Sequence, residues 1–270
     1  MKRKSTGSFY DYPKIYDVLF SDMCRCEIKF LTAIFNHFCS KKKDLSIFEP
    51  ACGSGRLLYH LAKLGFDVAG LDLNPRSVAF CNRRLKRHGF RESAVVGNMV
   101  SFSLADLGRT KKFDAAFNFV SSFLHLTTEA DAMQHLRTIA DVLKPGGIYL
   151  LGIHLKPKGT QHCAQESWSL RRGSRTIESH LKSLTQDLKK RIEMVEICVE
   201  VHTPTKHDKI VDRFPFRIYT ANQFNDMLAA VNRFDILETY SFDYDISQPI
   251  SVTPDTEDVV FVLTTRKPKA

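Results

Sequence analysis

Residues Leu45 to Leu58, LSIFEPACGSGRLL, constrain the fold of this chain more than any other stretch. Leu45 to Phe48 are typical of a buried strand, and a turn containing Gly53 and Gly55 follows before a helix begins. Glycine suits such a turn because it adopts positive φ and lets a ligand approach the bare backbone. The helix carries an apolar face at helical spacing. A strand, a glycine turn and a helix in this order present backbone N–H groups to a ligand at the end of the first strand.

Two features separate this turn from a dinucleotide-binding fingerprint. Leu58 stands where the third glycine of G-x-G-x-x-G is expected. Glu49 lies at the end of the strand, where a pyrophosphate would have to bind. Its carboxylate repels a phosphate and attracts a cationic or zwitterionic ligand. An NAD-dependent oxidoreductase is therefore disfavoured.

The sequence from Glu49 to Arg56, EPACGSGR, resembles the first motif of class I S-adenosylmethionine (SAM) dependent methyltransferases. SAM has no phosphate and carries a sulfonium and an ammonium, so it suits an acidic strand end. The resemblance implies an enzyme with SAM as cofactor. It also implies cofactor contacts at Glu49, Ala51, Cys52, Gly53, Gly55 and Arg56.

A second strand, Val68 to Leu71, ends at Asp72, which lies 17 residues after Gly55. That position is close to where an acidic residue meets a ribose diol, and a carboxylate accepts both hydroxyl protons. Asp72 is therefore predicted to bind the ribose, with Leu73 beside it. The alternative makes Asp72 only a helix cap, but Asn74 lies nearer to a helix that begins at Pro75.

A short third strand, Ser93 to Val96, leads into Gly97-Asn98-Met99. The methyltransferase family often has Gly-Asp-Met here, with the acid near the adenine amino group. The resemblance implies that the Asn98 carbonyl accepts this hydrogen bond without charge and that Met99 packs against the ring. The alternative is a plain Gly-Asn turn.

The fourth strand, Phe113 to Val120, runs into SSFLHL and resembles the fourth motif of the family. There the strand end lines the methionine half of SAM, which implicates Asn118, Phe119 and Ser122. His125 is a candidate general base, although a histidine between two leucines also suits a packing role. After a helix over 129–143, the Lys144-Pro-Gly-Gly147 turn leads to a fifth strand over 148–153.

The segment over 8–20 is rich in aromatic residues and precedes a helix predicted over 26–38. Many small-molecule methyltransferases have a similar tyrosine segment that closes over SAM. Tyr16 of Tyr16-Asp17 matches best, with Tyr10 or Tyr12 as substitutes. The alternative is simple packing of an amphipathic leader.

Strand–helix alternation stops after the fifth strand. Residues 156–219 contain alternating β patterns and Pro215, which suggests an edge strand, so we predict an antiparallel insert of three or four strands. Thr220 and Gln223 form a capping box, and strands over 234–242 and 258–265 close the fold. The predicted fold is α/β, a seven-stranded Rossmann-like methyltransferase sheet with this insert after strand five. Its parts are an N-terminal helical lid (1–44), the SAM-binding core (45–155), the insert as substrate cap (156–219) and the closing helix and hairpin (220–270).

The composition bounds the partners. Lys and Arg number 39 against 30 Asp and Glu, in clusters at Lys41–Lys43, 83–87, 171–175, 189–191 and the C-terminal tail. These clusters suit solvated faces, an RNA partner or an acidic substrate. No apolar run is long enough to cross a membrane. Seven cysteines without a Cys-x-x-Cys pair suggest reduced thiols in a cytoplasmic protein and no metal site.

The function predicted from these features is methyl transfer from SAM to a nucleophilic atom of a small molecule, with release of S-adenosylhomocysteine. A side-chain base is needed only if the acceptor arrives protonated. Two alternatives remain open, an RNA or protein methyltransferase and a catalytically silent SAM-binding protein. The acceptor's identity and the oligomeric state are not predicted.

Overall fold

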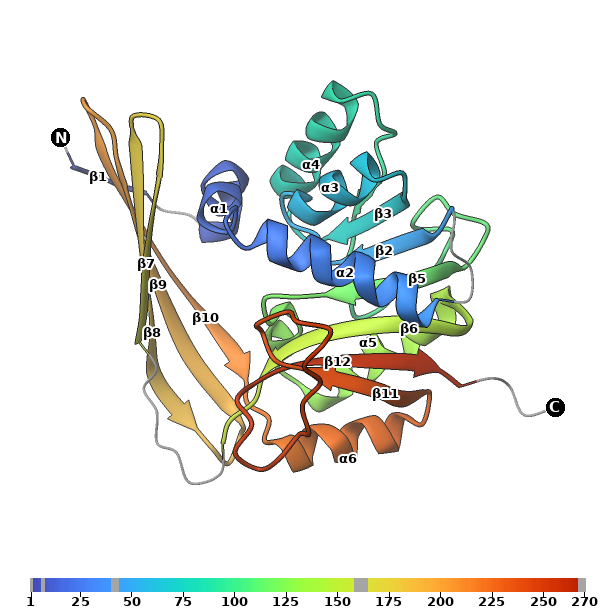
Figure 1. Cartoon of the computed structure of the whole chain (residues 1–270). Coiled ribbons are helices and arrows are strands. Elements are labelled where there is room, and N and C mark those ends of the chain that lie inside the picture. Colours follow the sequence, from blue (N-terminus) through green and yellow to red (C-terminus); the bar gives the residue numbers. More distant parts are fainter. Residues whose placement is uncertain (1, 6–7, 40–43, 158–164, 267–270) are drawn as a thin grey trace.

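Two β-sheets, one of seven strands and one of five, form the frame of the molecule (Figure 1). The computed structural model describes residues 2–5, 8–39, 44–157 and 165–266. The basic cluster Lys41–Lys43 and the end of the C-terminal tail lie outside these residues, as does Cys163. Within the described residues, no helix is both long and apolar enough to cross a membrane.

The seven-stranded sheet has the order β11-β12-β6-β5-β2-β3-β4, and its first five strands along the chain run parallel. β12 is antiparallel to both β6 and β11. The predicted Rossmann-like fold is confirmed. The strands are β2 (Ser46–Pro50), β3 (Asp67–Asp72), β4 (Ala94–Val96), β5 (Phe113–Asn118), β6 (Leu143–His154), β11 (Phe234–Tyr240) and β12 (Asp258–Thr265).

Helices cover both faces of this sheet, because neighbouring side chains on each central strand point to opposite faces. Ile47 packs with the apolar faces of α2 (Cys24–Phe38), α3 (Arg56–Lys63) and α4 (Pro75–Arg87). Phe48 points the other way, toward α5 (Glu129–Val142) and α6 (Ala221–Val231). Parallel strands joined by such crossovers bring their carboxyl ends to one edge of the sheet.

Local chemistry fixes where these helices begin. The Asn74 carboxamide oxygen accepts hydrogen bonds from the N–H groups of Arg76 (2.8 Å) and Ser77 (3.2 Å), and Pro75 occupies the first turn of α4. Asn74 is therefore the cap, and Asp72 remains available for another role. The predicted capping box of Thr220 and Gln223 opens α6.

The second sheet has the order β1-β10-β9-β8-β7. Its strands are β1 (Lys2–Ser5), β7 (Gln165–Arg172), β8 (Arg175–Asp187), β9 (Ile192–His202) and β10 (His207–Arg217). The antiparallel insert predicted after strand five, of three or four strands, has four, β7 to β10. The fifth strand, β1, comes from the N-terminus and pairs parallel with β10 only up to Ile210. Pro215 therefore lies where β10 has β9 as its single neighbour, as an edge position requires.

The N-terminal segment lies between the two sheets (Figure 1). It forms a short 3₁₀ turn, η1 (Phe9–Asp11), followed by α1 (Pro13–Leu19). Phe9, Val18 and Leu19 are buried in one cluster with inward residues of the second sheet, including Val199 and Ile210. This packing places α1 beside the carboxyl edge of the seven-stranded sheet.

Candidate functional site

A crevice of about 600 Å³ opens at the carboxyl edge of the seven-stranded sheet. The glycine turn after β2, the ends of β3 and β4, the 3₁₀ turn η2 (Ser122–His125) and the N-terminal segment supply its walls. Nine of the predicted site residues line it: Tyr16, Ala51, Gly53, Asp72, Leu73, Asn98, Met99, Ser122 and His125. Most of them lie at or after the ends of separate strands and Tyr16 lies in α1, so the fold itself brings them together.

The Asp72 carboxylate joins two turns of the crevice wall. Its Oδ2 accepts the Gly53 N–H at 2.7 Å, and its Oδ1 accepts the Asn74 N–H at 2.8 Å. Burial raises the pKa of Asp72 above its usual value. Each carboxylate oxygen keeps a further lone pair, so the group can also accept two ligand hydroxyls.

The two glycines of the turn are needed for different reasons. Gly53 has φ +52°, and a Cβ there would meet only the Tyr16 ring, at 3.9 Å, so this position faces the crevice. Gly55 does not line the crevice, because it packs against Cys81, whose sulfur would lie 2.1 Å from an added Cβ. Gly55 is thus required for the packing of α3 against α4, and the cofactor contact expected of it stays a prediction.

Backbone strain accumulates at the same edge. Ala51 after β2, and Val120 and Ser121 after β5, all have φ of 55°. Non-glycine residues rarely adopt this conformation, least of all a β-branched one such as Val120. Strain of this kind gathers where function holds a backbone in place.

A small hollow beside the glycine turn contains one buried acceptor, and a second lies at the end of β5. Glu49 lines the hollow together with Tyr16, Phe119 and Ser122. The Glu49 Oε2 has no hydrogen-bond partner, and burial raises the pKa of this carboxyl well above its usual range. Asn118 is fully buried at the end of β5, where its amide donates to the Pro50 carbonyl at 3.0 Å and its Oδ1 has no partner. Unsatisfied buried acceptors are costly, so they favour a ligand that donates hydrogen bonds or carries positive charge.

Arg56 and Cys52 also border this hollow, but their polar groups are engaged elsewhere. The Arg56 guanidinium makes a buried two-pronged ion pair with Glu27, including Nη2 to Oε1 at 2.7 Å, and donates to Cys24. The Cys52 thiol is hydrogen-bonded to the Cys81 thiol, and this bond, together with burial, raises the pKa of Cys52. Both side chains therefore also have structural roles, and the cofactor contacts expected of Cys52 and Arg56 stay predictions.

The Asn98 side chain differs from its expected role in one respect. Its carbonyl oxygen accepts the Val100 N–H at 2.9 Å, so the oxygen expected to meet an adenine amino group already closes its own turn. The Asn98 amide and a second lone pair on that oxygen remain. Met99 lines the crevice as expected, and Leu73 is exposed there at 72%.

The N-terminal segment lines one wall of the crevice with Ser8, Tyr10 and Tyr16 and is tied to neighbouring elements by side-chain hydrogen bonds. Asn74 donates to Asp11 at 2.8 Å, Ser77 donates to the Tyr10 carbonyl at 3.2 Å, and Ser54 donates to Asp17 at 3.1 Å. Burial raises the pKa of Tyr16 to about 12. The segment is thus fastened to both the glycine turn and the start of α4.

His125 contacts the N-terminal segment inside the crevice. Its Nε2 lies 2.8 Å from the Tyr10 hydroxyl, and its ring packs against Phe214 and Phe216 of β10. Burial lowers the pKa of His125 to about 4, so the imidazole is neutral at neutral pH. It can position a hydroxyl or accept a proton, and β10 places the second sheet at the same end of the crevice.

Sequence reasoning missed several polar residues of the crevice. None of them was predicted as a site residue, although Ser54 lies within the EPACGSGR motif; they are Ser8, Ser54, Asn74, Ser77, Thr127 and Asp131. Tyr10 was considered only as a substitute for Tyr16, although both tyrosines line the crevice.

One group outside the crevice has the composition of a metal site. Ligand atoms of Glu200, His202 and His207 lie within 4.8 Å of one another on the second sheet. Lys209 donates to the Glu200 carboxylate at 2.8 Å, and His207 lies 2.7 Å from its other oxygen. The carboxylate is already neutralised by a lysine, so the group is explained as an ion-paired surface cluster.

Comparison with known proteins adds a family and a fold. A family model described as a methyltransferase domain matches residues 47–147. A Streptomyces venezuelae dTDP-3-amino-3,4,6-trideoxy-alpha-D-glucopyranose N,N-dimethyltransferase is 29% identical over 39% of this chain and 41% of its own length. The chain matches only 40–42% of the length of such curated relatives.

Two solved structures resemble almost the whole chain. A S-adenosylmethionine-dependent methyltransferase from Clostridium acetobutylicum superposes with TM-score 0.73 at 15% identity, covering 96% of this chain and 99% of its own. SAM-bound CalS10, an amino pentose methyltransferase from Micromonospora echinaspora, gives 0.70 at 20% identity, covering 96% and 98%. At such identities the likeness establishes the fold, including the second sheet.

Proposed function

Residues 47–147 of this chain form a methyltransferase domain of the class I SAM-dependent family, and from this premise we propose that the protein transfers a methyl group from SAM to a small molecule. The alignments span less than half of each relative's length, so the proposal rests on the crevice and on the residues around it. The observation that carries it is the crevice at the carboxyl edge of the sheet, which Tyr10 and Tyr16 help to line and in which Asp72 offers free lone pairs to a ligand.

The residues present fit SAM. Asp72 has lone pairs for the ribose hydroxyls, and Met99 and Leu73 offer apolar surface for the adenine. The unpartnered Glu49 Oε2 and Asn118 Oδ1 suit the ammonium end of the methionine moiety. When bound, SAM supplies a methyl group already activated by its sulfonium.

The chain's own contribution is to align the acceptor and to keep the site dry. Tyr10 and Tyr16 help to line the crevice, and Phe214 and Phe216 pack against His125 at its end. A crevice of this size suits an acceptor that can be enclosed. The role proposed for His125, whose neutral imidazole is hydrogen-bonded to the Tyr10 hydroxyl, is to orient the acceptor and to act as its base where one is needed.

A macromolecular acceptor fits less well. An RNA-modifying enzyme gains affinity from cations that flank the mouth of its site. None of the arginines at 83–87 or 171–175 lines the crevice. Small molecules are also the substrates named for the relatives, such as an amino sugar nucleotide and an amino pentose.

The test is to incubate the full chain with SAM labelled at its methyl group and a cell extract separated into low-mass, RNA and protein fractions. We expect label in the low-mass fraction, with no transfer by Asp72→Ala. Label in RNA or protein would replace the small-molecule proposal with a macromolecular one. Tight binding of SAM with no labelled product in any fraction would point to a non-catalytic SAM-binding protein.

A further inference from the structure

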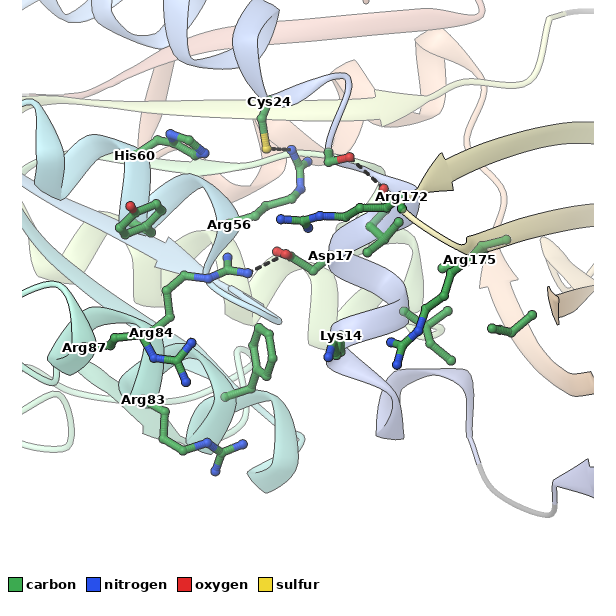
Figure 2. Close-up of a pocket in the computed structure, with 18 of the residues that line it drawn as sticks. Lys14, Asp17, Cys24, Arg56, His60, Arg83, Arg84, Arg87, Arg172 and Arg175 are labelled. Carbon is green, nitrogen blue, oxygen red and sulfur yellow. Dashed lines mark hydrogen bonds and ion pairs between the residues drawn. The ribbon is translucent and has the colours of Figure 1, made fainter. Parts of the chain in front are cut away.

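A second cavity, of about 960 Å³, lies between α1, α4 and the hairpin of β7 and β8 (Figure 2). It shares no lining residue with the crevice, although α1 contributes to both. Tyr16 faces the crevice, whereas Lys14, Asp17 and Val18 face the second cavity. The proposed methyl transfer leaves this second cavity without a role.

The charge of this cavity is strongly positive. Seven lysine and arginine side chains line it against one carboxylate, Asp17. Asp17 pairs with Arg84 at 2.5 Å, and Arg56 is neutralised by Glu27. Among the described residues, no carboxylate lies within 4 Å of the charged nitrogens of the other five, which are Lys14, Arg83, Arg87, Arg172 and Arg175.

These five cations are held together at a cost. Arg83 and Arg87 are four residues apart on α4 and therefore share a helix face. Arg172 and Arg175 are direct partners in the β7–β8 ladder on either side of a two-residue turn. Like charges in both arrangements repel and destabilise the element that carries them. The two elements then face each other across one cavity, although they are far apart in the sequence (Figure 2).

The pKa of a neighbouring imidazole, His60, is lowered mainly by burial and not by the five unpaired cations. The charges of Lys63 and Arg84 lower the pKa of His60 further. His60 lines the same cavity. An anion bound among these side chains would remove the repulsion that the fold otherwise retains.

We propose that this cavity binds a small ligand that carries two or more phosphate groups. Guanidinium groups offer planar forks of donors that match phosphate oxygens in pairs, and here they come from two opposite walls. The volume is that of a small-molecule site. The proposal does not depend on methyl transfer, since none of its residues lines the crevice.

The aromatic residues of the cavity favour a small ligand over a nucleic acid strand. Single-stranded nucleic acids gain affinity by stacking their bases on exposed rings. The Arg84 guanidinium lies 5.0 Å from the centre of the Phe80 ring and 5.8 Å from that of Tyr59, so a cation covers both rings. Ile177 and Val201 add buried apolar wall to the cavity but no exposed ring on which a base could stack.

The experiment is calorimetric titration of the full chain with inorganic tripolyphosphate and with ADP at physiological salt, without SAM. We expect saturable binding of one ligand per chain, weakened at least tenfold in the double variant Arg83→Gln, Arg172→Gln. The matched control is Arg25→Gln, Arg91→Gln, which removes the same charge from two exposed arginines outside the cavity. All substituted side chains are exposed, and thermal melting verifies that each variant is folded.

The two ligands distinguish the source of the phosphates. Tighter binding of ADP than of inorganic tripolyphosphate supports an organic ligand, and the reverse supports an inorganic one. Equal weakening in both double variants would overturn the proposal, because it would reflect net charge alone. Absence of binding to the wild-type chain would overturn it as well. So would a single-stranded RNA that binds more tightly than tripolyphosphate and loses affinity in the cavity variant.

Discussion

Replacing Glu49 with Gln separates two effects of one buried carboxyl. The Glu49 Oε2 is buried without a hydrogen-bond partner, and burial is the main cause of its raised pKa, with Arg56 acting in the opposite direction. In the proposed complex this oxygen accepts from the ammonium of SAM. A hydrogen bond to a charged group contributes about 1.5–3 kcal/mol. Its loss therefore weakens SAM binding by about 10- to 150-fold.

The assay is calorimetry at pH 8 with three ligands. SAM and S-adenosylhomocysteine both carry the ammonium, so both should lose affinity in Glu49→Gln. Methylthioadenosine lacks the ammonium and the sulfonium, so its affinity should be unchanged. A uniform loss for all three ligands, or no loss for any, would refute the assignment of Glu49 to the cationic end of the cofactor.

The same substitution should act on stability with the opposite sign. A carboxyl whose pKa is higher in the folded than in the unfolded state contributes stability that is lost as pH rises through the folded pKa. Glu49→Gln should therefore melt at a higher temperature than the wild-type chain at pH 8, and should show no such gain near pH 4. SAM binding to the wild-type chain should release a proton and strengthen as pH rises, and Glu49→Gln should abolish both effects.

Three further substitutions test the site and its support. Asp72→Ala should reduce SAM affinity at least tenfold in calorimetry with an unchanged circular dichroism spectrum, because charge-assisted hydrogen bonds are lost; unchanged affinity would remove Asp72 from the site. Gly53→Val should abolish SAM binding, whereas Gly65→Val, also at positive φ but with open space around it, should retain binding at a similar cost of about 1–2 kcal/mol in urea denaturation. Arg56→Met should destabilise the chain by about 3–5 kcal/mol by leaving Glu27 buried and charged, and the added Glu27→Leu should recover most of this; no recovery would mean that the arginine acts through another contact.

Much of the fold could be predicted because its signals are local. The glycine turn, the Asn74 cap and the Thr220 capping box each depend on a few neighbouring residues, and each lies where its chemistry requires. The parallel order of the strands then follows from right-handed crossovers. β1 could not be predicted in this way, since its only partner is β10, near the other end of the insert.

The candidate site was predictable at strand ends and less so elsewhere. Asp72 ends β3, and Asn98 and Ser122 come shortly after the ends of β4 and β5, so a parallel sheet brings them to one edge. Arg56 belongs to the glycine-turn motif, but its guanidinium is buried against Glu27 of α2. No spacing rule in the sequence predicts this contact between two helices. The sequence motif fixes the backbone of the turn, whereas the direction of each side chain depends on its tertiary neighbours.

The basic clusters show most clearly what the sequence could not decide. As sequence, the arginines at 83–87 and 171–175 favoured solvated faces, with an RNA partner or an acidic substrate as alternatives. The two groups of arginines come together only because the β7–β8 hairpin packs near α1 and α4. That packing depends on the apolar contacts of Val18 and Leu19 with the second sheet. Helix and hairpin therefore present their charges to one another because a hydrophobic contact beside them outweighs the repulsion. A polyanion bound between α4 and the β7–β8 hairpin would replace this repulsion with attraction, and would so hold the second sheet against the core.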